Sequence, residues 1–128
     1  MMRYSAFAVA MLVACSTFST FAYAQDAGDP VAGKAVFARC AICHKVAKDA
    51  GNGLGPNLFG IVGRKSATLA GFEYSGPMKA SGITWTNDKL SQWVAGPAKM
   101  VPGTKMAFPG ITSKGDIRNV VAYLDSLK

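Results

Sequence analysis

The sequence contains very little histidine and cysteine, and this scarcity excludes one common kind of metal site. His44 is the only histidine among 128 residues, and the three cysteines are Cys15, Cys40 and Cys43. A structural zinc site needs four ligands of the Cys or His type. Downstream of residue 24 only three such side chains remain, all within one short segment. A zinc site is therefore not expected.

The sequence also lacks an apolar run long enough for a membrane-spanning helix, which needs about 20 residues. Its most apolar stretch, residues 6–14, follows a short basic start and precedes the small-x-small triplet Ala22-Tyr23-Ala24. This arrangement predicts a secretory signal peptide over residues 1–24, cleaved after Ala24, and a periplasmic location. By its length, the remaining chain, residues 25–128, is one domain.

Two alternatives would leave the protein attached to a membrane. Residues 12–15, "LVAC", resemble the lipidation box of bacterial lipoproteins, which would tether the chain through Cys15. A leader that is retained rather than cleaved would act as an anchor as well. If neither holds, the protein contacts a membrane only through its partners.

Acidic residues are few, with 7 Asp and Glu against 14 Lys and Arg, so the net charge is +7. Loss of residues 1–24 would remove Arg3 and no acid, leaving +6. A basic surface favours acidic partners and speeds their encounter. Nucleic acid is not an expected partner, because an exported protein seldom meets it and no basic run is interleaved with aromatic residues.

The apolar periodicity predicts an all-α fold with three main helices, short helical turns and long loops. Asp29 before Pro30 is typical of a helix start, and Ser113 followed by Asp116 resembles a capping box. The expected helical segments are residues 30–40, ending in the cysteine pair; a turn over 76–82; residues 86–95, ended by Gly96-Pro97; and residues from 113 onward, with Ile117, Val120, Val121, Leu124 and Leu127 on one stripe.

The two long loops, residues 50–70 and 100–110, are rich in glycine or constrained by Pro102 and Pro109. Three short helices joined by such loops make a poor core on their own. Long loops in compact domains are usually functional or wrapped around something. We therefore expect a large apolar ligand at the centre of the domain, with the loops forming the walls of its pocket.

Residues 40–44, "CAICH", have the pattern C-x-x-C-H, which is typical of covalent haem attachment. Two thiols add to the porphyrin vinyl groups as thioethers, and positions i and i+3 of a helical turn lie on one face. His44 would then lie beneath the iron as its proximal ligand. A thioredoxin-like dithiol pair is an alternative, but the alternating β–α pattern that it needs is not visible.

Because His44 is the only histidine, the other face of the iron is either open or bound by a different side chain. Met78, Met100 and Met106 are available, and Met106 lies between two prolines that stiffen its loop. Local reasoning leaves this choice open. An open sixth position would favour a haem peroxidase or a gas-binding haem protein.

The chain from residue 25 to residue 128 resembles the class I c-type cytochromes, close to the mitochondrial and purple-bacterial cytochrome c2 branch. The resemblance implies the small cytochrome c fold and a one-electron carrier, not an enzyme, with one covalently bound haem c. It rests on "CAICH", "GPNLFGIVGRK" (residues 55–65), "GFEYS" (71–75), "GITWT" (82–86), "PGTKMAF" (102–108) and "VVAYL" (120–124).

The same resemblance implies how the haem is held. Cys40 and Cys43 would form the thioethers, and His44 and Met106 would be the axial ligands. The carbonyl of Pro56 would accept a hydrogen bond from the His44 ring and so fix its orientation.

Further residues match family positions around the haem. Arg64, Tyr74 and Trp85 match residues around the propionates. Met78 and Trp93 are departures, since mitochondrial relatives carry an asparagine and a tyrosine there, the latter near the axial sulfur. Gly33 and Tyr123 match the contact between the first and last helices.

The resemblance also implies partners. A cytochrome bc complex is the expected donor, and a terminal oxidase or a photosynthetic reaction centre is the expected acceptor of a monomeric carrier. Arg39, Lys45, Lys99 and Lys105 flank the attachment motif and the Met106 loop, so we expect them to ring the exposed haem edge and to attract acidic surfaces.

Overall fold

The computed structural model describes residues 27–128; the predicted signal peptide and Cys15 lie outside the described residues. Helices are the only extended regular elements in this part of the chain, and an isolated bridge pairs Lys65 with Thr84. The all-α prediction is confirmed. The helices are α1 (Pro30–Phe37), α2 (Gly76–Ser81), α3 (Asn87–Ala95), α4 (Pro97–Met100) and α5 (Lys114–Asp125).

The predicted capping residues begin the main helices. The Asp29 carboxylate accepts a hydrogen bond from the backbone N–H of Val31 at 2.8 Å, directly before α1. The Ser113 hydroxyl accepts one from the N–H of Asp116 at 3.2 Å, and Thr86 caps α3 in the same way. Each cap satisfies an amide at a helix start that has no partner within the helix.

Two helix boundaries differ from the prediction. The first helix ends at Phe37, before the cysteine motif, because Cys40 N–H bonds the Phe37 carbonyl at 2.7 Å, three residues back. The motif therefore lies in tight turns that follow α1. Gly96 ends α3 as expected, but Pro97 begins α4, since the fixed φ of proline suits the first helical position.

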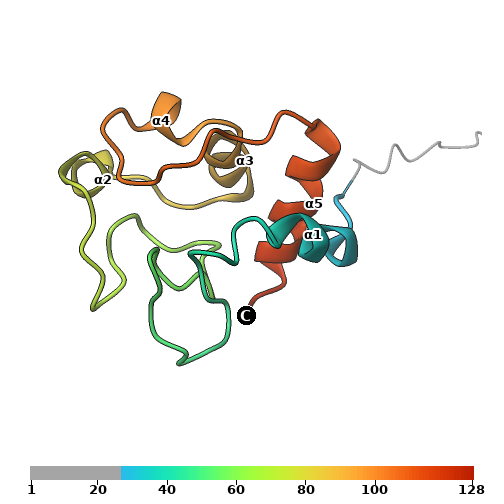
Figure 1. Cartoon of the computed structure of the whole chain (residues 1–128), viewed down its shortest axis with the longest axis horizontal. Coiled ribbons are helices and arrows are strands. Elements are labelled where there is room, and N and C mark those ends of the chain that lie inside the picture. The colour runs from blue at the N-terminus through green and yellow to red at the C-terminus, as the bar shows by residue number, and fades with distance from the viewer. Residues whose placement is uncertain (1–26) are drawn as a thin grey trace, which may run out of the picture.

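The first and last helices cross at close range, as Figure 1 shows for α1 and α5. Gly33 of α1 is buried at the crossing, where a Cβ atom would overlap the backbone carbonyl of Asn119 and the Cβ of Tyr123. The Tyr123 ring also packs on Phe37, with centroids 5.2 Å apart. Only glycine lets the two backbones approach this closely.

Replacing Gly33 by alanine is expected to lower the free energy of unfolding by roughly 1–3 kcal/mol, because overpacking against backbone atoms cannot relax through side-chain rotation. Denaturant unfolding of the haem-loaded protein measures this. Gly76→Ala is the matched control, since Gly76 is also helical and has nothing within 4 Å of the added Cβ. Equal unfolding midpoints for the two variants would contradict this account of the crossing.

The remaining elements enclose the centre of the domain. In Figure 1, α2, α3 and α4 lie along one side, while the loop of residues 44–70 lies along the other. None of the helices in residues 27–128 combines the length and apolarity needed to cross a bilayer. The buried apolar side chains are Phe37, Ile61, Met78, Trp85, Leu90, Val94, Val101, Ile111, Val120, Val121 and Leu124.

Candidate functional site

A cavity of about 690 Å³ opens between the helices and the loops. Its size falls within the range of about 300–1,000 Å³ that is usual for ligand and cofactor sites. Most of its lining is apolar. All the site residues predicted from the sequence line it, namely Cys40, Cys43, His44, Pro56, Arg64, Tyr74, Trp85, Trp93 and Met106.

The two cysteines are free, half-buried thiols that line the cavity. The Cys43 N–H bonds the Cys40 carbonyl at 3.0 Å, which closes a tight turn and brings both side chains to the same cavity. Burial raises the pKa of the Cys40 thiol, while the nearby charge of Arg39 lowers it in part. No disulfide joins the two cysteines in the structure, so both sulfur atoms are available for bonding to another group.

The His44 ring is oriented by the loop that follows it. Nδ1 lies 2.7 Å from the Pro56 carbonyl, which can only accept, so Nδ1 carries the proton and Nε2 keeps its lone pair. Burial lowers the pKa of His44, and the hydrogen bond to Pro56 opposes this shift. A neutral imidazole with one free nitrogen is the form that binds metals.

The sequence analysis missed two residues that shape the loop after His44. A Cβ atom on Gly55 would meet the imidazole ring, so this glycine makes room for it. Asn57 is buried and donates from its amide to the carbonyls of Ala47 and Gly51, at 2.9 and 3.0 Å. An asparagine within a glycine-rich loop was the available signal, because such loops need side chains to satisfy their backbone.

The structure separates the three candidate methionines. Met78 and Met106 line the cavity, whereas Met100, at the end of α4, does not. Met78 is 7% exposed, and its sulfur lies 3.7 Å from the Ser81 hydroxyl. Met106 is half-buried in the loop that forms another wall.

Aromatic and polar side chains complete the lining. Trp85 and Trp93 meet edge to face with centroids 5.4 Å apart, and Tyr74 packs on Phe72 in a similar way at 4.8 Å. The Arg64 guanidinium donates to two backbone carbonyls, those of Asn57 at 3.1 Å and Phe59 at 2.6 Å. Arg64 thus ties the loop of residues 57–64 together at the cavity.

The basic residues expected around the opening are only partly brought together. Arg39 and Lys105 line the cavity, and Lys65, which was not singled out, lies there too. Lys45 and Lys99 are exposed but do not line it.

The donor set fits a haem bound through its vinyl groups. Two thiols, one imidazole with a free nitrogen and a thioether all face one apolar cavity of cofactor size. Together with the small helical fold wrapped by long loops, this chemistry defines a c-type haem protein.

Comparison with known proteins places the chain within that class. The Cytochrome c family model matches residues 30–128, so the protein belongs to the cytochrome c family. Cytochrome c-554 of Methylosinus trichosporium is 50% identical over 105 residues, 82% of this chain and 80% of the relative. Cytochrome c2 of Rhodoblastus acidophilus is 47% identical over 102 residues, 80% of this chain and 95% of the relative.

A solved structure agrees with these relatives. Cytochrome cH from Methylobacterium extorquens superposes with a TM-score of 0.73 at 44% identity, covering 77% of this chain and 99% of that one. The chain therefore carries one covalently bound haem c and serves as an electron carrier between redox proteins, not as an enzyme. A peroxidase or gas-binding function is not favoured.

Proposed function

We propose that this protein carries single electrons between membrane redox complexes, with haem attached through Cys40 and Cys43 and the iron held by His44 and Met106. The supporting observation is that one cavity receives the only imidazole and the Met106 thioether from segments far apart in the chain. Haem held in this way supplies one reversible electron change, and a methionine ligand raises its potential.

The chain's own residues would assist the one-electron oxidation and reduction of the iron. The Pro56 carbonyl fixes the His44 ring and makes it a stronger electron donor to a metal. Met78, Trp85 and Trp93 line an apolar wall that limits water, which disfavours the additional charge of the oxidised state. Arg64 and Tyr74, with Trp85, would surround the propionate groups.

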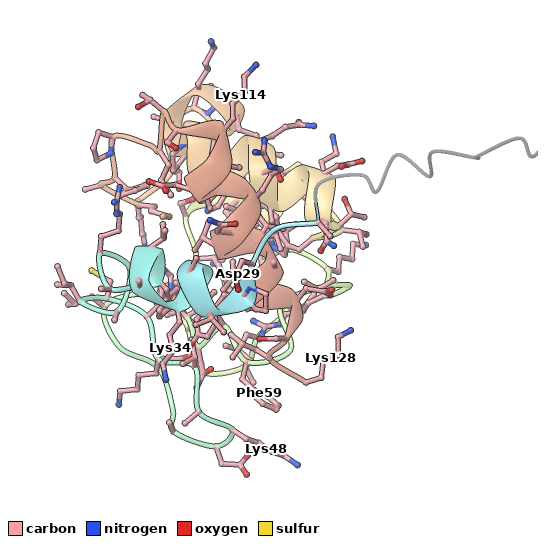
Figure 2. All side chains as sticks on the ribbon, turned by 90° about the vertical axis from the view of Figure 1, so that its right-hand side faces the viewer. Asp29, Lys34, Lys48, Phe59, Lys114 and Lys128 are labelled. Atoms are coloured by element: carbon pink, nitrogen blue, oxygen red, sulfur yellow. The ribbon has the colours of Figure 1, made fainter. Side chains whose placement is uncertain are left out.

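The expected location and partners follow from the leader and the charge. Residues 1–24 would direct export to the periplasm, with residues 25–128 as the functional domain. Lys34, Lys48 and Lys114 project outward from different elements in Figure 2, in keeping with a basic surface, and we expect the protein to act as a monomer. Acidic surfaces of a cytochrome bc complex as donor, and of a terminal oxidase or photosynthetic reaction centre as acceptor, match this charge.

Spectroscopy and redox titration of purified protein test the proposal. We expect a reversible one-electron transition and, in the ferric state, a far-red absorption band from methionine bound to iron. Cyanide is expected to react slowly, because the sixth position is filled. Rapid cyanide binding without the far-red band would instead indicate an open site.

A further inference from the structure

The Met106 loop, residues 101–110, makes several of its hydrogen bonds within itself. Thr104 N–H bonds the Val101 carbonyl, Met106 N–H bonds the Thr104 hydroxyl and Phe108 N–H bonds the Met106 carbonyl, at 3.1, 3.3 and 3.1 Å. In the described part of the chain, one hydrogen bond links this loop to a distant segment. It runs from the Lys105 ammonium to the backbone carbonyl of Glu73, at 3.1 Å.

Glu73 is itself fixed by a second lysine. Its carboxylate accepts a hydrogen bond from Lys79 of α2 at 2.7 Å. Hydrogen bonding and charge from Lys79 lower the pKa of Glu73, and the charge of Lys105 adds to this effect. Lys79 and Lys105 thus both act on Glu73, one from α2 and the other from the Met106 loop.

The loop and α2 also touch through apolar atoms. A Cβ added to Gly103, which has a φ of +84°, would lie 3.0 Å from Pro77 Cγ. Glu73 and Lys105 line the same cavity as Met106, so these contacts are made at its edge. In Figure 1, the loop passes beside α2 before it returns towards α5.

We propose that Lys105, Glu73 and Lys79 form a clasp that holds the Met106 loop against residues 71–79, and so positions the Met106 thioether and limits access to the sixth position of the iron. This inference rests on the proposed function, in which Met106 binds the iron. The three residues are positioning residues, since none of them is a ligand. Lys105 donates the hydrogen bond that joins the loop to residue 73. The Lys79–Glu73 ion pair restrains Glu73, whose backbone carbonyl accepts that hydrogen bond.

The strengths of the two contacts predict which substitution, at Lys105 or at Glu73, has the larger effect on the Met106 loop. The Glu73 and Lys79 side chains are 80% and 53% exposed, so their ion pair contributes little by itself. Among the described residues, the hydrogen bond from Lys105 is the only one that joins the loop to residues 71–79, so its loss should matter more. The Lys105 hydrogen bond and the Glu73–Lys79 ion pair both act through the Glu73 backbone carbonyl. Glu73→Gln should therefore add little to the effect of replacing Lys105.

The test uses the haem-loaded ferric protein and imidazole as the external ligand. Lys105→Ala is expected to raise imidazole affinity roughly threefold to tenfold, the effect of one lost hydrogen bond. Glu73→Gln is expected to raise it about twofold. Hydrogen–deuterium exchange measured by mass spectrometry should become faster in residues 101–110 and stay unchanged in α1 and α5. Lys105→Arg, which keeps a donor, should restore the parent behaviour.

The controls match the variants in charge. Lys99→Ala removes an exposed lysine from α4, and Asp125→Asn breaks the Lys128–Asp125 pair, whose atoms lie 3.5 Å apart. Both should behave like the parent. If Lys105→Ala binds imidazole and exchanges like Lys99→Ala while the parent shows the far-red band, the clasp is wrong. If the parent itself lacks that band, the proposed Met106 ligation is what fails.

Discussion

Replacing Met106 by alanine is expected to abolish the far-red band of the ferric protein and to lower its midpoint potential by on the order of 0.1 V or more. The thioether is a soft ligand that stabilises ferrous iron, so its loss favours the ferric state. The side chain lies in the haem cavity and is half-buried, so the substitution removes few core contacts. Absorption spectroscopy and a redox titration measure both effects.

Two control variants separate the candidate ligands. Met100 does not line the cavity, so Met100→Ala should keep both the band and the midpoint potential. Met78 does line the cavity, but its sulfur lies near the Ser81 hydroxyl, so Met78→Leu should keep the band as well. A band that survives in Met106→Ala and disappears in Met78→Leu would reassign the ligand to Met78.

The double variant Cys40→Ser, Cys43→Ser is expected to lose all covalently bound haem. Serine hydroxyls do not add to the vinyl groups in place of thiols, while the turn and the His44–Pro56 hydrogen bond need neither sulfur atom. Protein made in a host that exports and attaches haem should therefore show no haem stain on a denaturing gel, and its intact mass should lack one haem. Each single variant should keep one thioether.

The parent protein provides the comparison for this experiment. It should keep its colour after boiling, because thioether bonds survive denaturation. If the parent releases its colour and shows a disulfide between Cys40 and Cys43, the pair acts as a dithiol and the attachment hypothesis is wrong. The double variant would then bind haem as the parent does.

Much of the fold could be predicted because its signals are local. A cap such as Asp29 or Ser113 acts within three residues of its own position, so spacing along the sequence revealed both helix starts. The predicted end of the first helix was wrong, since the apolar period continues to Cys40 although the hydrogen bonds tighten at Phe37. The start of α4 at Pro97 was missed for a similar reason, because Gly96-Pro97 is typical of a helix end.

The sequence by itself was enough to predict where haem would be attached, because two thiols and the imidazole of His44 lie on one short segment whose spacing suits a single rigid disc. Only the tertiary structure decided which methionines line the cavity, and that Gly55 makes room for the histidine ring. It also decided that Lys105 meets Glu73, 32 residues away in the chain. Such contacts form between residues that are far apart in the sequence and meet only when the loops fold back on one another. They follow no periodic pattern along the chain, so the sequence alone does not reveal them.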